Sequence, residues 1–262
     1  GVGVGVGVGV GVGVGVGVDV DVDVVLDVVL GALSLHLMFF HALLHKWPRW
    51  EYAGLLAISV FMIYGMDRQI DNRLASASDD LHRFHAHYQK PILGLMFVLG
   101  VMNAILLARV ELNLLVLGLS LLTILFGYWF AWVKGLFEKY WGTKELFTSL
   151  IYSLGILLPS CLFADFPFLL GISLFLLVLL NLWIFTWISI GGKRYYVSLL
   201  IYVSLVLLLL LGILGFNLFV VGIMLMIWGI HVGIYYFRAQ MHMRLWAEWA
   251  FASPLIYILC NL

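Results

Sequence analysis

The feature that most constrains the fold is a series of apolar runs, many long enough to cross a lipid bilayer, separated by short polar breaks. Hydrophobic residues make up 64% of the 262 residues and charged residues only 11%, whereas soluble domains carry about 25% charged residues. A bilayer core of about 30 Å needs roughly 20 apolar residues per helix. The sequence therefore predicts an all-α, polytopic membrane protein and excludes a soluble domain.

Cutting the apolar runs at charged or Pro- and Gly-rich breaks predicts nine transmembrane helices. The loops between them are short, so neighbouring helices are expected to be antiparallel and to form one bundle, the domain 24–262. The predicted spans are residues 24–44, 52–70, 91–109, 113–133, 146–163, 167–190, 195–214, 217–237 and 245–262.

The first 23 residues differ from the rest of the chain. Gly and Val alternate over residues 1–18, and Asp and Val alternate from Asp19 to Asp23. A lone Gly-rich strand has no partner strand and few side chains to pack. We therefore expect residues 1–23 to be a low-complexity tail without a fold.

Lysines and arginines are concentrated in alternate loops. The even-numbered loops hold eleven of them, whereas the odd-numbered loops hold only Lys46, Arg49 and Arg109. Positive residues accumulate on the cytoplasmic side of a membrane. The pattern predicts an integral, multi-pass protein whose N-terminus and even-numbered loops are cytoplasmic, while the zero formal net charge argues against nucleic acid as a partner.

The longest of the predicted cytoplasmic loops follows a polar stripe at the end of the second span. Tyr64, Asp67, Arg68 and Asp71 are spaced so that they fall on one helix face. Two carboxylates one turn apart at a membrane boundary can hold Mg²⁺ while substrate phosphates fill its other positions. The alternative is a helix end that Arg68 stabilises by pairing with Asp71.

Several short motifs resemble one membrane-protein family. Asp67-Arg-x-x-Asp71 resembles the second half of the Asn-Asp-x-x-Asp-x-x-x-Asp signature of UbiA-type intramembrane prenyltransferases, which also lies at the cytoplasmic end of the second of nine helices. Lys144-Glu145 followed by Tyr152-Ser-Leu-Gly155, His82-Arg-Phe-His85, and residues 244–254 resemble hydrophobic UbiA-like proteins. The resemblance covers residues 24–262 and rests on the order of the motifs and the topology.

The resemblance implies a fold and a reaction. Nine helices would surround a pocket open to the bilayer, where Mg²⁺ and an isoprenoid diphosphate bind, and the isoprenoid group would pass to a lipid-soluble acceptor. Asp67 and Asp71 would be the catalytic residues and the metal ligands. The expected substrate-binding residues are Tyr64, Arg68, Arg73, His82, Arg83, Lys144, Lys193 and Arg194.

The sequence departs from the family pattern in two places. Ile63 and Tyr64 replace the leading Asn-Asp of the first motif, and residues 181–194 contain no carboxylate where the second acidic motif is expected. Either Lys193 and Arg194 replace the charge of a second metal ion and hold an anionic head group directly, or the fold persists with its transferase activity lost or changed. In the second case these two residues serve only to orient the chain in the membrane.

Two further functions remain open on the sequence alone. His82, His85 and His87 have a spacing that also suits iron in a membrane metal oxygenase. A transporter would instead carry ionisable groups along a path across the membrane, and the predicted spans offer mainly amides and hydroxyls. Most ionisable groups gather near one membrane face, which favours a one-sided pocket.

Overall fold

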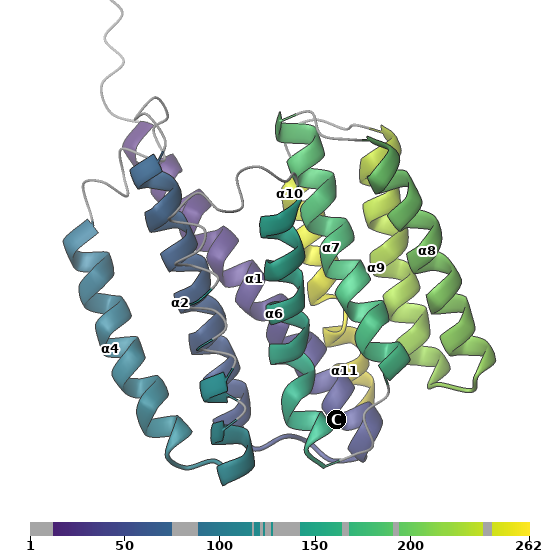
Figure 1. The fold of residues 1–262 in the computed structure, drawn as a ribbon, viewed down its shortest axis with the longest axis horizontal. Coiled ribbons are helices and arrows are strands. Elements are labelled where there is room, and N and C mark those ends of the chain that lie inside the picture. Colours follow the sequence, from purple (N-terminus) through teal and green to yellow (C-terminus); the bar gives the residue numbers. More distant parts are fainter. Residues whose placement is uncertain are drawn as a thin grey trace, which may run out of the picture.

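The helices of the computed structural model stand side by side, with α4 at one edge and α8 at the other (Figure 1). The structure describes residues 13–74, 89–116, 118–120, 123, 127, 142–163, 168–190, 194–237 and 243–262. Within these ranges, the side chains at 13–25, 66–74, 89, 189–190, 194, 243–245 and 248 lie outside the description. The described residues form nine helices and no strand, which confirms the all-α class.

Most helix bounds follow the apolar runs. The helices are α1 (Gly13–Leu44), α2 (Trp50–Leu74), α4 (Gln89–Leu107), α6 (Thr143–Cys161), α7 (Phe168–Ile190), α8 (Arg194–Ile213), α9 (Leu218–Phe237), α10 (Met243–Ala252) and α11 (Leu255–Asn261). Helix α1 begins at Gly13 and so includes residues 13–23 of the predicted tail. The predicted span 113–133 is described only in part, as helix at 112–116 and at a few positions beyond.

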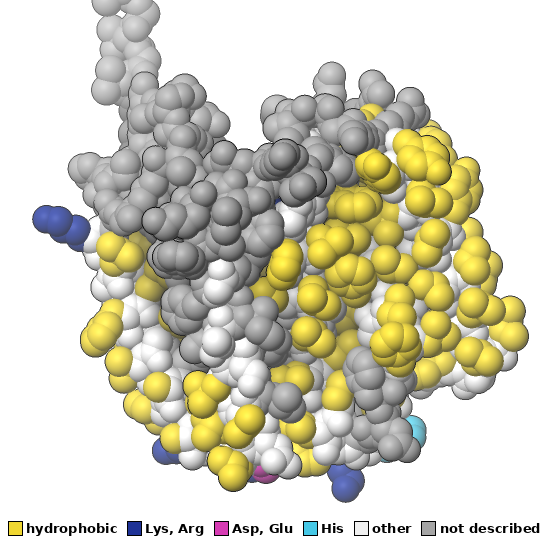
Figure 2. All heavy atoms as spheres, in the orientation of Figure 1, with side chains coloured by type: hydrophobic (Ala, Val, Ile, Leu, Met, Phe, Trp, Pro, Cys, Tyr) yellow, Lys and Arg dark blue, Asp and Glu magenta, His cyan; other side chains and the backbone are white. Residues whose placement is uncertain are grey.

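Five of these helices are long and apolar enough to cross a membrane. The five segments are Leu26–Leu44, Lys90–Leu107, Phe168–Ile188, Tyr195–Ile213 and Leu218–Phe237. The apolar parts of α2 and of α10 with α11 are shorter. Apolar side chains cover much of the visible surface over α7 and α8 (Figure 2), as expected of helices that face lipid. The fold is compatible with an integral membrane protein, and the count of nine spans stays a prediction.

Helix α1 lies at the centre of the bundle. It contacts α2, α6, α9, α10 and α11, whereas the main contact of α4 is with α2. Its fully buried side chains Leu35, Met38 and Phe39 join the largest hydrophobic cluster, together with residues of α6, α7 and α9 such as Ile156 and Leu174. We call the end of the bundle where α2, α7 and α9 end and α4, α6 and α8 begin the upper end, as it is drawn in Figure 1. The opposite end is the lower end.

The turn between α8 and α9 shows how local sequence makes neighbouring helices antiparallel. Gly215 has a φ of 80°, a left-handed conformation that glycine adopts easily. The amides of Gly215 and Phe216 bond to the carbonyls of Gly212 and Leu211 at 3.2 and 3.1 Å, which closes α8 with a Schellman motif. The side chain of Asn217 then accepts from the amides of the first turn of α9.

The last predicted span, 245–262, is wrong as a single helix, because Ser253 and Pro254 divide it into α10 and α11. Proline has no amide hydrogen and interrupts the helical hydrogen bonds. The Ser34 hydroxyl of α1 donates to the carbonyl of Phe251 at 3.0 Å. Within a membrane each backbone carbonyl needs such a partner, so α1 stabilises the break.

Candidate functional site

The polar end of α2 lies at the upper end of the bundle. Helix α2 continues to Leu74, beyond the predicted end at residue 70, so Asp67 and Asp71 both lie on its backbone one turn apart. The side chains of Asp67, Arg68, Asp71 and Arg73 lie outside the described residues. Their role as the site therefore stays a prediction.

The beginning of α6 is fixed against α7 by a glycine. Gly142 has a φ of 82°, and a Cβ there would lie 2.8 Å from Nε1 of Trp183. Its carbonyl accepts from the Leu146 amide at 3.0 Å and faces the Trp183 indole Nε1 at 3.5 Å. Only glycine combines this conformation with such a close approach. The contact sets the height at which the first turn of α6 presents its charged side chains.

Sequence reasoning missed the contact that this arrangement produces. The Thr186 hydroxyl of α7 donates to Oε1 of Glu145 at 2.6 Å. Thr186 lies within residues 181–194, the segment that lacks its own carboxylate. Glu145 of α6 thus places a carboxylate beside the segment 181–194, which contains no acidic residue of its own. The predicted ligand Lys144 is its neighbour in the first turn of α6.

Glu145 and Asp67 lie at similar heights along the bundle. Helices α2 and α6 meet where a Cβ on Gly155 would lie 3.6 Å from Cδ1 of Leu56. From this contact, Asp67 is eleven residues further along α2 and Glu145 is ten residues back along α6. At about 1.5 Å per residue, these positions are about 16 and about 15 Å above the contact. Two helices therefore bring acidic residues to the same level.

The other predicted site residues fall partly outside the described chain. Tyr64 lies on α2 and is half-buried, whereas Arg194 is the first residue of α8 and its side chain lies outside the description. His82, Arg83 and Lys193 lie outside the described residues altogether. The backbone therefore places Lys144, Arg194 and the acidic turns of α2 at the upper end.

The histidines of the described helices are dispersed. His36 on α1 contacts the carbonyl of Ile156, His41 contacts Tyr257, and His231 on α9 contacts Asn181. No three His, Cys, Asp or Glu side chains converge as a metal site in the described part of the chain. His82, His85 and His87, on which the iron hypothesis rests, lie outside it.

The lower end carries a separate charged cluster. The Arg49 guanidinium donates to Glu51 at 3.0 Å and to Glu111 at 3.2 Å, and the Tyr52 hydroxyl donates to Glu111. The bond with Glu51 raises the pKa of Arg49 above its ordinary value. The bond from Tyr52, with help from Arg49, lowers the pKa of Glu111. Arg49 thus shares one positive charge between two carboxylates and links the N-terminus of α2 to the segment after α4.

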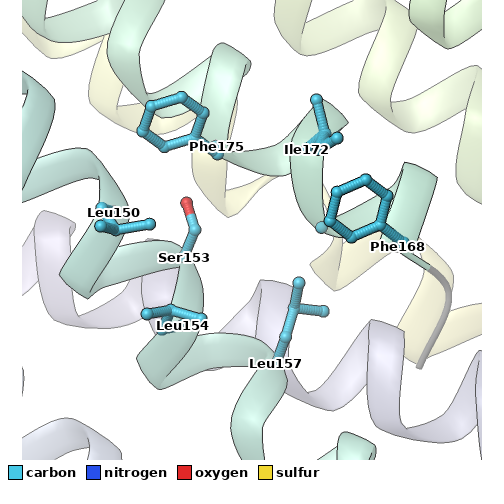
Figure 3. Close-up of a pocket in the computed structure, with 8 residues that line it drawn as sticks. Leu150, Ser153, Leu154, Leu157, Phe168, Ile172 and Phe175 are labelled. Carbon is cyan, nitrogen blue, oxygen red and sulfur yellow. The ribbon is translucent and has the colours of Figure 1, made fainter. Parts of the chain in front are cut away.

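An apolar groove of about 190 Å³ lies between α6 and α7. Figure 3 shows the Ser153 hydroxyl directed between Leu150 and Phe175. The other lining residues are Leu154, Leu157, Phe168, Gly171 and Ile172. Because Phe168 is 69% exposed, the groove opens on the outer surface and suits a hydrocarbon chain better than a polar ligand.

Comparisons of the chain with protein-family models, with curated proteins and with solved structures find no match.

Proposed function

We propose that the protein binds an isoprenoid diphosphate at the upper end of the bundle and transfers its isoprenoid group to a lipid-soluble acceptor. The observation that carries the proposal is the contact between Glu145 and Thr186. The motifs that resemble UbiA-type prenyltransferases lack an acid after the sixth predicted span, and Glu145 supplies one from the preceding helix.

The chemistry of the donor set fits Mg²⁺. Carboxylates are hard oxygen ligands, which magnesium prefers together with substrate phosphates. Asp67 and Asp71 at the end of α2 and Glu145 on α6 would hold the ion, and Mg²⁺ supplies the positive charge that a departing diphosphate requires. Lys144, Arg68, Arg73 and Arg194 would contact phosphate oxygens as permanent cations.

The hydrocarbon part of such a donor would bind in the groove between α6 and α7. Leu150 at one end of the groove lies five residues along α6 from Glu145, or about 7.5 Å at the helical rise. A donor with its diphosphate beside Glu145 would extend its chain between the same two helices. Apolar walls would also exclude water from the reacting carbon.

The proposed transfer is a substitution at the first carbon of the isoprenoid group. The bond from that carbon to the diphosphate oxygen breaks, and the electron pair leaves with the diphosphate. A nucleophilic atom of the acceptor forms the new bond and loses its proton. The cations at the upper end would hold the leaving group where the charge develops, and the acidic residues would act through the Mg²⁺ that they bind.

The proposal is tested with purified protein in lipid nanodiscs and tritiated farnesyl diphosphate as the probe. We expect binding that requires Mg²⁺. Asp67→Asn and Asp71→Asn should each weaken it on the order of a hundredfold, since loss of even an outer-shell partner costs tenfold to a hundredfold. Glu111→Gln at the lower end is the matched control and should bind as the wild type does.

The same assay separates transfer from binding alone. Release of diphosphate together with tritium in a product of the extracted membrane lipids indicates transfer, whereas Mg²⁺-dependent binding without release indicates a lipid- or diphosphate-binding member of the fold. Equal binding by wild type and both Asp variants would refute the site. Stoichiometric iron in the purified protein would favour the oxygenase instead.

A further inference from the structure

Two residues of α7 contact the first turn of α6 at the upper end. Trp183 and Thr186 are three positions apart and therefore lie on one face of α7. The Trp183 indole faces the carbonyl of Gly142 at 3.5 Å. One turn along, the Thr186 hydroxyl donates to Oε1 of Glu145 at 2.6 Å. Helix α7 thus holds both the backbone and the carboxylate of this turn of α6.

Thr186 differs from other hydroxyl-bearing residues of the same two helices. The hydroxyls of Thr148 on α6 and Ser173 on α7 each donate to the carbonyl four residues earlier in their own helix, at 2.9 and 2.8 Å. Serine and threonine within a helix often bond in this way. Thr186 instead donates to a side chain of another helix. Because a hydroxyl has only one hydrogen to donate, that of Thr186 is committed to Glu145.

The bond from Thr186 engages only one of the two carboxylate oxygens of Glu145. The other oxygen, Oε2, has no hydrogen bond or ion pair to any residue that the structure describes. Glu145 is half-buried near the membrane boundary, where an uncompensated negative charge is costly. A cation bound at Oε2 would compensate this charge. With Oε1 held by Thr186, such a cation would meet one oxygen of Glu145 rather than both.

We propose that Thr186 makes the site at the upper end select Mg²⁺ against Ca²⁺, because it restricts Glu145 to coordination through one oxygen. Ca²⁺ accepts carboxylates through one or both oxygens in flexible shells, whereas Mg²⁺ requires a nearly octahedral shell. A carboxylate that is free to turn can offer both oxygens to Ca²⁺, and the bond from Thr186 prevents this. The inference rests on the proposed function, since it takes Mg²⁺ as the ion that Asp67, Asp71 and Glu145 hold.

A purely structural bond between the two helices would have a different consequence. A hydrogen bond that only joins α6 to α7 stabilises the bundle, and its loss would weaken the binding of every cation to the same degree. A bond that restricts the carboxylate changes the ratio between the affinities for Mg²⁺ and Ca²⁺. This ratio is therefore the quantity to measure.

The test uses the full chain in nanodiscs of a zwitterionic phospholipid, with metal ions alone as the probe. Electron resonance follows free Mn²⁺ while Mg²⁺ or Ca²⁺ competes with it for the site, and the signal of the site is the Mn²⁺ binding that Asp67→Asn removes. We expect the wild type to favour Mg²⁺. Thr186→Val should lower the ratio of the Mg²⁺ to the Ca²⁺ affinity about tenfold, at the lower end of the effect of losing an outer-shell partner. Thr186→Ala should act in the same way, whereas Thr186→Ser keeps the hydroxyl and should retain the ratio.

Thr148→Val is the matched control, because it removes a hydroxyl of α6 that bonds within its own helix; it should leave the ratio unchanged. An unchanged ratio in Thr186→Val and Thr186→Ala would overturn the proposal, and so would a wild type that favours Ca²⁺ or binds no Mn²⁺ at this site. If farnesyl diphosphate still binds in a Mg²⁺-dependent way while the ratio stays unchanged, only the role of Thr186 is refuted. If the wild type binds neither Mn²⁺ nor farnesyl diphosphate, the proposed function is refuted as well.

Discussion

The two ends of the bundle use carboxylates in different ways. At the lower end, Glu51 and Glu111 lie 3.0 and 3.2 Å from the Arg49 guanidinium, so both negative charges share one cation. At the upper end, Glu145 bonds to the neutral hydroxyl of Thr186, and no ion pair to it is found among the described residues. Uncompensated charge at a membrane boundary is costly. The lower end is therefore a structural joint, whereas the proposed site at the upper end requires that its carboxylates be available to a ligand.

The largest effect on stability is expected at Gly142, where the beginning of α6 contacts α7 at the upper end. Gly142→Ala would place a Cβ 2.8 Å from Trp183 Nε1 at a φ of 82°. We expect a loss of about 2–4 kcal/mol of stability, from left-handed strain and from displacement of the indole. Thermal unfolding in nanodiscs measures it. Farnesyl diphosphate binding should weaken as well, because Gly142 positions the first turn of α6, in which Glu145 lies.

The lower end supplies the control for this variant. Gly215 has a φ of 80°, but a Cβ there meets nothing within 4 Å. Gly215→Ala should therefore cost only the strain, about 1–2 kcal/mol, and should not alter ligand binding. Equal loss of stability and of binding in both variants would show that the contact with Trp183 has no special role.

A smaller effect separates charge from fold at the upper end. Glu145→Gln keeps an oxygen that accepts from Thr186, so the helices should stay in place. The lost negative charge removes one charge-assisted interaction, and we expect Mg²⁺-dependent binding of farnesyl diphosphate to fall about tenfold. Glu111→Gln, the corresponding change at the lower end, should leave the affinity unchanged. A Glu145→Gln protein that binds as tightly as the wild type would remove Glu145 from the site.

The sequence predicts those features that depend on neighbours along the chain. The helices follow apolar runs, and the spacing of Asp67 and Asp71 places them one turn apart on α2. The pairing of Glu145 with Thr186 joins residues 41 positions apart. This pairing depends on how α6 packs on α7 at Gly142. The periodicity of apolar residues along the sequence does not indicate which helices pack together. The predicted span 245–262 runs through Pro254 because the residues on both sides are apolar, and Ser34, which bonds to the carbonyl of Phe251 at the break, lies on another helix.

The smallest effect concerns pH and the lower end. The Tyr52 hydroxyl and Arg49 hold the pKa of Glu111 below its ordinary value of 4.5. A carboxylate whose pKa is lowered by folding stabilises the folded protein at pH values above its ordinary pKa. This stabilisation is lost as the pH falls through the lowered pKa of the folded protein. The wild type should therefore lose some thermal stability below pH 4.5, and Glu111→Gln should lose less. The difference should be small because Glu111 is partly exposed; parallel pH curves for the two proteins would contradict this role.

The most direct measurement asks at which end the metal and the diphosphate bind. Mn²⁺ replaces Mg²⁺ in the presence of farnesyl diphosphate, and pulsed electron resonance gives its distance from a nitroxide at Tyr195→Cys or at Ile213→Cys, both exposed positions on α8. Cys161 and Cys260 are first replaced by Ser. The two labels lie about 27 Å apart along the helix. The account predicts bound Mn²⁺ nearer to the label at 195, and its loss in Asp67→Asn. Mn²⁺ nearer to the label at 213, or undiminished in Asp67→Asn, would contradict it.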